Sequence, residues 1–221
     1  MSLPVSIYYC QLSGTDDPEI FDRLLHALPV QSKSSVVKYA AEQDRRLRIA
    51  GKALLQYGLQ QLDPSDKNPL DQYRHTEGKK PMLQDSDFQF SISHSGNVAV
   101  CAIAKGIPLG LDVEQVLPLE TDLLQPSFNE VQWQNILQAT DVLYELYRQW
   151  TIKEAALKAW GIAIGEVELK EIHIEDDTVR YGGHSLPYHV TELVAGYTAC
   201  IAGAHNQDKI NFLHIALTAL Q

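Results

Sequence analysis

The chain is poor in basic residues and in long apolar runs, and each shortage excludes a class of protein. Its 221 residues include 18 Lys and Arg against 28 Asp and Glu, which gives a net charge of −10. A surface that follows nucleic-acid phosphates needs an excess of basic residues, so we expect no nucleic-acid partner. No apolar stretch approaches the roughly 18 residues that span a bilayer, and the first twelve residues lack the basic start of a signal peptide. We therefore expect a cytoplasmic protein that does not bind membranes.

Cysteine is also scarce, and one common nucleotide motif is missing. The three cysteines, Cys10, Cys101 and Cys200, lie far apart in apolar segments that are typical of strands. This spacing fits neither a zinc site nor a disulfide framework, and it favours buried thiols in a reducing compartment. The pattern G-x-x-x-x-G-K-[ST] does not occur, which counts against an ATP-binding phosphate loop.

The stretch from Phe90 to Glu114 predicts three strands joined by tight turns. Residues 98–104 are apolar, residues 105–108 interrupt the run, and the pattern resumes at 109–113. Alternate residues of a strand share a face, so Asp112 and Glu114 should project side by side while their neighbours enter the core. Two adjacent carboxylates repel each other unless a cation lies between them, and oxygen ligands favour Mg²⁺.

A helix is predicted from residue 150 to Gly161, where glycine ends it. Trp150, Glu154 and Lys158 recur every four residues and therefore share one face. An exposed face with charge pairs at i,i+4 would explain the two charges. However, tryptophan prefers burial, and an acid and a base on a half-buried face favour a binding or catalytic site.

Together these motifs resemble the signature of the 4′-phosphopantetheinyl transferases, and in particular the larger surfactin-synthetase-activating type. The order and spacing of three motifs carry the resemblance, namely S-H-S, then G-x-D-x-E, then W-x-x-K-E-A-x-x-K-x-x-G. Every motif position is filled in this chain: Ser93, His94, Ser95, Gly110, Asp112, Glu114, Trp150, Lys153, Glu154, Lys158 and Gly161.

The resemblance implies an enzyme that moves 4′-phosphopantetheine from coenzyme A to a serine of an apo carrier protein and releases 3′,5′-ADP. It implies that Mg²⁺ is bound by Asp112, Glu114 and Glu154. Glu154, directly or through a bound water, would be the base, with Asp112 and Lys158 also catalytic. Lys153 and Lys158 would contact the coenzyme phosphates.

Further coenzyme contacts are implied in the first half of the chain. Six basic residues fall between positions 33 and 52. Of these, Arg46 best matches the family's phosphate-binding arginine, with Lys33 or Lys38 as alternatives. Lys80 matches a lysine that normally follows glycine, although this chain has Lys79 in place of that glycine. Ser93 and His94 would grip a phosphate at a turn.

The predicted fold is α+β, with two pseudo-symmetric halves, residues 1–105 and 106–221. Each half should pack a long helix on a small antiparallel sheet, with the active site in the cleft between them. A faint repeat supports the duplication, because residues 98–104 resemble residues 197–203. Other elements are predicted as a strand at 5–12, helices at 17–28, within 32–62, at 127–137 and at 141–161, and strands at 167–175, 188–193, 197–202 and 210–215.

Two other functions remain open at this point. One is a different Mg²⁺-dependent phosphotransfer enzyme that uses ATP, and the other is a module that binds carrier proteins without catalysis. The second would predict damage to the carboxylate set, which is intact. We expect a monomer whose partners are acyl carrier, peptidyl carrier or polyketide synthase carrier domains, and the sequence does not distinguish among these carriers. A docking surface is expected near Phe128–Leu137, with Val131 and Trp133 available.

Overall fold

A computed structural model describes residues 4–37, 39–75, 80–204 and 209–221. The chain divides into two compact units. Unit 1 contains Met1–Ile107 together with Asp208–Gln221, and unit 2 contains Pro108–Gln207. Of the predicted site residues, Lys38 lies outside the described residues.

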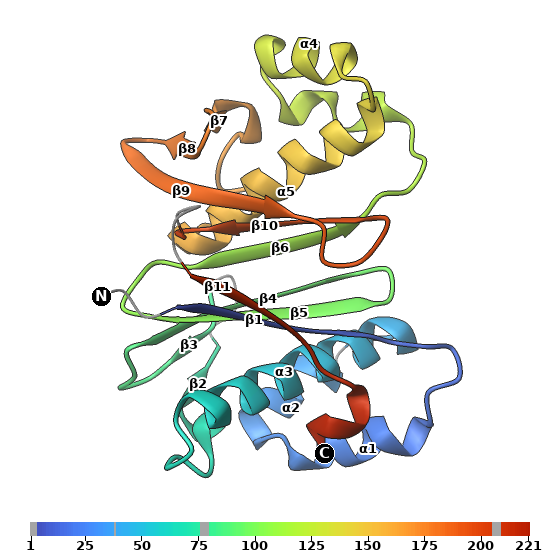
Figure 1. The fold of residues 1–221 in the computed structure, drawn as a ribbon, viewed down its shortest axis with the longest axis vertical. Coiled ribbons are helices and arrows are strands. Elements are labelled where there is room, and N and C mark those ends of the chain that lie inside the picture. Colours follow the sequence, from blue (N-terminus) through green and yellow to red (C-terminus); the bar gives the residue numbers. More distant parts are fainter. Residues whose placement is uncertain (1–3, 38, 76–79, 205–208) are drawn as a thin grey trace. The chain divides into compact units, whose positions relative to one another are not determined.

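Unit 1 is a four-stranded sheet with helices on one face (Figure 1). The strand order is β11-β1-β5-β4, in which β4 and β1 flank β5 as antiparallel neighbours and β11 runs parallel to β1. The strands are β1 (Val5–Gln11), β4 (Phe88–Ser95), β5 (Val98–Lys105) and β11 (Ile210–His214). The helices are α1 (Pro18–Ala27), α2 (Val30–Val37) and α3 (Glu42–Leu62), and a small hairpin pairs β2 (Tyr73–Arg74) with β3 (Met82–Leu83).

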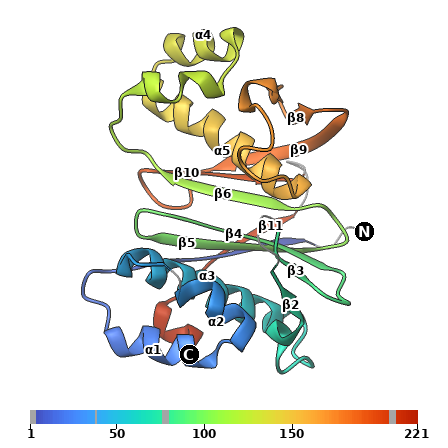
Figure 2. The same ribbon diagram turned by 180° about the vertical axis from the view of Figure 1, so that it is seen from behind.

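The long helix α3 can approach the sheet closely because it carries glycine at the contact. A Cβ atom at Gly58 would lie 2.6 Å from side-chain atoms of Ile103 and Tyr8. The absence of a side chain therefore lets α3 pack directly on β5 and β1. Viewed from behind in Figure 2, α1 and α2 lie on the same side of the sheet as α3.

Unit 2 is an antiparallel sheet covered by one long helix, α5 (Val142–Trp160). The strand order is β6-β10-β9-β8-β7, with β6 (Gly110–Gln115), β7 (His173–Ile174), β8 (Thr178–Tyr181), β9 (His184–Thr191) and β10 (Tyr197–Ala202). The shorter helix α4 (Glu130–Gln138) packs against α5.

Both ends of α5 have the expected local signals. The side chain of Asp141 accepts a hydrogen bond from the Tyr144 backbone N–H, and Gly161 ends the helix with φ 73° in the left-handed region. At the sheet, a Cβ atom on Gly110 would lie only 1.8 Å from the backbone oxygen of Ala155. The start of β6 and the middle of α5 thus meet backbone to backbone, which brings the carboxylates of β6 next to the helix.

The α+β prediction is confirmed, and both regions of the predicted repeat have the same setting. Residues 98–104 and 197–202 form β5 and β10, and each strand is covered by the long helix of its unit. Among the described residues, none of the helices combines the length and the apolar character needed to cross a membrane.

Two parts of the sequence interpretation differ from the structure. The chain after residue 207 does not stay with the second half, because β11 pairs with β1 of unit 1. The predicted strand at 167–175 is wrong over most of its length. Leu169–Glu171 is a turn of 3₁₀ helix and β7 has only two residues, while the hairpin of β8 and β9 was missed. Gly182 and Gly183, both at positive φ, form its two-residue turn, and a Gly-Gly pair is a signal that could have revealed it.

Candidate active site

The predicted carboxylates lie on the helix-facing side of the sheet in unit 2. Asp112 is almost completely buried, with 1% of its surface exposed, and Glu114 is partly exposed. Leu111 and Val113, which alternate with them, are fully buried. The predicted strand is present, but burial does not alternate along it, because residues 110–113 are all buried.

Lys158 of α5 reaches across to β6 and pairs with Asp112. Its Nζ atom lies 2.6 Å from Asp112 Oδ1, and the two groups form a charge-assisted hydrogen bond. Burial opposes the charge of the ammonium, but Asp112, Glu154 and Glu114 together outweigh it, so the pKa of Lys158 is raised. Lys158 is therefore a permanent cation at neutral pH, placed among carboxylates.

Glu154 has the opposite character, because its surroundings disfavour its charge. Burial first, and then the negative charge of Asp112, raise the pKa of Glu154 to about 7, and Lys158 only partly offsets them. A carboxyl group that gives up its proton near neutral pH suits general base catalysis. Trp150, one turn earlier on α5, hydrogen-bonds to Glu154, so the predicted shared face is present.

The three carboxylates fit a hard metal by their chemistry. They offer only oxygen donors, and they act on one another electrostatically, since Asp112 and Glu114 both raise the pKa of Glu154. Among the residues that the structure describes, however, no group of three or more His, Cys, Asp or Glu side chains is arranged to hold a metal. The cation that the structure places on Asp112 is Lys158.

Lys153 does not lie where the sequence predicted. Its side chain is completely buried, and its Nζ donates hydrogen bonds of 2.8 Å to Ser127 O, Gln132 Oε1 and Leu169 O. It also lies over the Phe128 ring, 4.7 Å from the centroid. Burial lowers the pKa of Lys153 to about 7. An ammonium has three N–H donors, and protein oxygens occupy all three, so we do not propose Lys153 as a coenzyme ligand.

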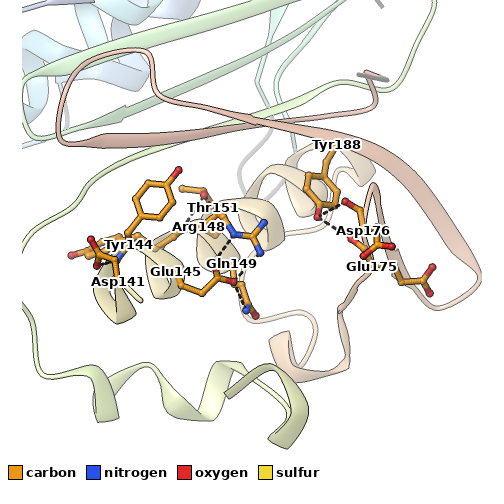
Figure 3. Close-up of polar contacts among 10 residues, drawn as sticks. Asp141, Tyr144, Glu145, Arg148, Gln149, Thr151, Glu175, Asp176 and Tyr188 are labelled. Carbon is orange, nitrogen blue, oxygen red and sulfur yellow. Dashed lines mark hydrogen bonds and ion pairs between the residues drawn. The ribbon is translucent and has the colours of Figure 1, made fainter. Parts of the chain in front are cut away.

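Polar contacts around the first half of α5 are drawn in Figure 3. Arg148 donates two hydrogen bonds to Glu145, at 2.6 Å and 2.8 Å, and Gln149 donates one to the same carboxylate. Burial opposes the charge of Glu145, but these donors outweigh it and lower its pKa. The network links residues 145, 148 and 149, which lie on α5 before Glu154 and are buried or partly buried.

Unit 1 contains a separate candidate, a cavity of about 200 Å³ with two cationic side chains in its lining. Its lining residues are Tyr39, Arg48, Lys52, Tyr73, His75, Pro81, Ile92 and His94. Arg48 stacks on Tyr39 with its Cζ 3.6 Å from the ring centroid, and Lys52 donates a 2.9 Å hydrogen bond to the hydroxyl of Tyr73. The cavity therefore combines positive charge with two aromatic rings, a combination suited to a nucleotide phosphate and base.

Burial disfavours the charge of two lysines at or next to this cavity, whereas Arg48 has Asp44 as a counter-ion. Burial, and then the neighbouring Arg48, lower the pKa of Lys52 to about 8. Burial also lowers the pKa of Lys80, next to Pro81, to about 8. Asp44 lies 2.9 Å from Arg48 and 3.7 Å from His94. An incoming anion would stabilise the charged form of both lysines.

The structure brings some predicted coenzyme contacts to this cavity and leaves others out. His94 lines the cavity, and Ser93 is the residue before His94 in the chain. Both belong to strand β4 and not to the turn that was predicted. Arg46 instead pairs with Glu42 and packs over the Phe21 ring, 5.0 Å from its centroid.

Lys33 is also not among the residues that line the cavity. Its Nζ donates a 2.8 Å hydrogen bond to His26 O. Arg48 and Lys52, which the sequence interpretation did not select, lie on the cavity. Asp44, Arg48 and Lys52 lie at positions i, i+4 and i+8 of one helix. This spacing is the sequence signal that could have identified Arg48 and Lys52 as site residues.

Comparisons with known proteins agree with the division into two units. The model of the 4′-phosphopantetheinyl transferase superfamily matches residues 108–202, and the model of the 4′-phosphopantetheinyl transferase N-terminal region matches residues 15–106. The first therefore covers the carboxylates and α5, and the second covers the cavity of unit 1.

Individual relatives are similar at low identity. The chain is 28% identical to the 4′-phosphopantetheinyl transferase gsp of Aneurinibacillus migulanus over 160 residues, which are 71% of this chain and 66% of the relative. It is 21% identical to the 4′-phosphopantetheinyl transferase Sfp of Bacillus subtilis, in a match that covers 91% of this chain and 93% of the relative. It is 25% identical to the human L-aminoadipate-semialdehyde dehydrogenase-phosphopantetheinyl transferase, with 73% and 58% covered.

For the first three relatives, the match spans between half and two thirds of the relative's own length. Both family models nevertheless describe 4′-phosphopantetheinyl transferases, and together they extend over both units. The chain therefore belongs to the 4′-phosphopantetheinyl transferase superfamily, a superfamily of transferase enzymes.

Proposed function

We propose that the protein transfers 4′-phosphopantetheine from coenzyme A to a serine of an apo carrier protein and thereby converts the carrier to its holo form. The observation that carries the proposal is the group formed by Asp112, Glu154 and Lys158, in which a carboxyl group with a pKa of about 7 lies beside a permanent ammonium. Membership of the superfamily supports the reaction class.

The reaction is a displacement at the diphosphate of coenzyme A. The serine oxygen forms a bond to the phosphorus that carries pantetheine, and the bond from that phosphorus to the oxygen of the 3′,5′-ADP leaving group breaks. Glu154 accepts the serine proton, for which its pKa near neutrality is suited. Lys158 places a positive charge where the leaving phosphate gains negative charge.

Asp112 has two roles in this proposal. It fixes the position of Lys158 through the 2.6 Å hydrogen bond, and its charge raises the pKa of Glu154. Asp112, Glu114 and Glu154 would together hold Mg²⁺, which supplies positive charge to the diphosphate when it is bound.

The coenzyme phosphates are proposed to bind at the cavity of unit 1. Arg48, Lys52 and His94 line it, and Lys80 and Ser93 lie beside lining residues. We propose Arg48 in place of Arg46 as the phosphate-binding arginine of this helix, because Arg48 lines the cavity, whereas Arg46 is not among the lining residues and contacts Glu42 and Phe21.

We further propose the surfactin-synthetase-activating type and a monomeric enzyme. The match to the Bacillus subtilis relative extends over nearly all of both chains, whereas the match to the human relative covers 58% of that protein. An ATP-dependent phosphotransfer enzyme is the alternative that the experiment below must exclude.

The test is to incubate the protein with coenzyme A, Mg²⁺ and a panel of apo carrier domains, and to measure the intact mass of each carrier. We expect addition of phosphopantetheine to at least one carrier, with release of 3′,5′-ADP in equal amount and loss of both in the presence of a chelator. Modification of no carrier, or phosphate transfer from ATP in place of coenzyme A, would contradict the proposal.

A further inference from the structure

The excess of negative over positive charge in this protein lies in unit 2. Unit 1 has 13 basic and 13 acidic residues and is neutral, whereas unit 2 has 5 basic and 15 acidic residues. The net charge of −10 therefore belongs to the unit that carries Glu154. A partner that approaches this unit meets a strongly negative surface.

Every cation of unit 2 is already bound by oxygen atoms of the same unit. The partners are Glu145 for Arg148, three oxygens for Lys153, Asp112 for Lys158, Glu168 for Lys170, and Glu175 for Arg180. Figure 3 shows the first of these, where Arg148 and Gln149 both donate hydrogen bonds to Glu145. Within the described part of unit 2, all five basic side chains are thus engaged.

One segment of unit 2 is both acidic and apolar at its surface. No lysine or arginine occurs between Lys105 and Arg148. Within this stretch, residues 117–137, here called the 117–137 segment, expose four large apolar side chains, which are Leu117, Leu123, Val131 and Leu137. Leu123 and Val131 are 72% and 70% exposed. The exposed charged residues of the 117–137 segment are all acidic: Glu120, Asp122 and Glu130.

The 117–137 segment is fixed to the catalytic helix. Phe128, Trp133 and Ile136 pack in a small core with Leu146 of α5. Trp133, predicted at a docking surface, is therefore a core residue. Lys153 ties Ser127 O and Gln132 Oε1 to α5 directly before Glu154. A surface that is held in place before a partner arrives loses little entropy on binding.

We propose that the 117–137 segment docks the apo carrier, and that it selects carriers whose contacting surface is apolar and neutral or basic over strongly acidic carriers. This inference rests on the proposed function. The exposed leucines and valine provide the apolar contact, and the acidic residues between them repel carboxylates of the partner. Since the basic side chains of unit 2 are engaged, an acidic carrier finds no compensating cation there.

The experiment compares three forms of one carrier domain that differ only in the exposed charges around the modified serine. One form keeps acidic residues there, one has glutamine, and one has lysine. We expect kcat/KM to rise about three- to tenfold from the acidic to the neutral form at low ionic strength. Added salt should raise kcat/KM for the acidic form, because it screens repulsion.

Matched variants assign the selectivity to the segment. Glu120→Lys with Asp122→Lys should abolish or reverse the preference. Asp22→Lys with Asp71→Lys gives the same change of net charge at exposed positions of unit 1, and should leave the preference unchanged. The inference would be overturned if the natural protein and both double variants showed the same carrier preference. It would also be overturned if both double variants lost the preference to the same extent.

The apolar contact is tested by Leu123→Ser with Val131→Ser, which should raise KM for every carrier form. Ile164→Ser, at an exposed position elsewhere in unit 2, should not. A dimer that separates in the double variant would instead show that a second copy covers the segment. Binding of labelled apo carriers is measured alongside transfer. Selective binding without transfer would contradict only the proposed function, and transfer without selectivity would contradict only this inference.

Discussion

Replacement of Lys153 by methionine should greatly weaken unit 2. The side chain is fully buried, and its ammonium supplies hydrogen bonds to three oxygens from three different segments of the chain. Methionine fills a similar volume but donates nothing, so Ser127 O, Gln132 Oε1 and Leu169 O lose their donor. A buried acceptor left without its donor costs about 1–3 kcal/mol.

The total cost for the three acceptors is smaller than three times this value, because the surrounding chain relaxes partly and water can enter to donate hydrogen bonds. Burial of the ammonium is also unfavourable, as the lowered pKa of Lys153 shows, and the substitution removes that cost. The expected net loss is about 3–5 kcal/mol in the free energy of unfolding, because three neutral acceptors that each cost about 1–3 kcal/mol are left behind and the two effects above offset part of that sum. Native proteins are stable by about 5–15 kcal/mol, so a large share of the total would be lost.

The assay is urea unfolding followed by circular dichroism, with amide hydrogen exchange to locate the change. Protection should fall first at residues 127–132 and 169–172. The control is Lys170→Met, which removes an exposed lysine paired with Glu168 and should change stability little. If Lys153→Met is as stable as the control, or more stable than the natural protein, the reasoning is refuted and Lys153 becomes available again as a coenzyme ligand.

Three further predictions concern other parts of the two units. Arg48→Gln should raise the KM for coenzyme A at least tenfold, as expected when a charge-assisted contact is lost, whereas Arg46→Gln should change it little. Gly110→Ala should destabilise the protein by about 1–3 kcal/mol or more in thermal unfolding, because the new Cβ would lie 1.8 Å from a backbone oxygen of α5. The control is Gly14→Ala, where no atom lies within 4 Å of the new Cβ and stability should not fall. The pKa of Glu154 is raised to about 7 in the folded state, so without metal the natural protein should lose stability as the pH rises from about 4.5 to 7. Glu154→Gln should lose less stability over the same range. Equal slopes of unfolding free energy against pH in the two proteins would contradict this.

Local patterns predicted the parts of the site that depend on one element alone. The alternation around Asp112 specified a strand with two carboxylates on one face, and the spacing of Glu154 and Lys158 specified one face of a helix. Gly161 ended that helix as expected. These features follow from backbone geometry, which the sequence period reports directly.

Residues whose role depends on how a helix is rotated against its sheet were harder to predict. Arg46 and Arg48 differ by two positions on α3, and only the packing of α3 decides that Arg48 lines the cavity. Lys153 precedes Glu154, yet it turns inward to bind carbonyl oxygens. Nothing in the period of residues 149–161 distinguishes a buried lysine of this kind from an exposed one.

Long-range pairing was the other limit. β11 joins β1 across almost the whole chain, and a strand pattern at 210–215 does not reveal which sheet it joins. The assignment of the last residues to the second half followed from sequence order alone, and it was wrong for that reason.

The proposed chemistry is tested most directly by the turnover of Glu154→Gln against that of Lys170→Gln. The substitution at 154 keeps the size of the side chain and removes its basicity, and a positioned base contributes on the order of 10²–10⁴-fold to the rate. At saturating coenzyme A and Mg²⁺, we predict a fall in kcat of that order, partial activity in Glu154→Asp, and normal activity in Lys170→Gln, with all three proteins folded. Similar turnover in Glu154→Gln and Lys170→Gln would contradict the account and leave Glu154 as one member of a charge pair on α5.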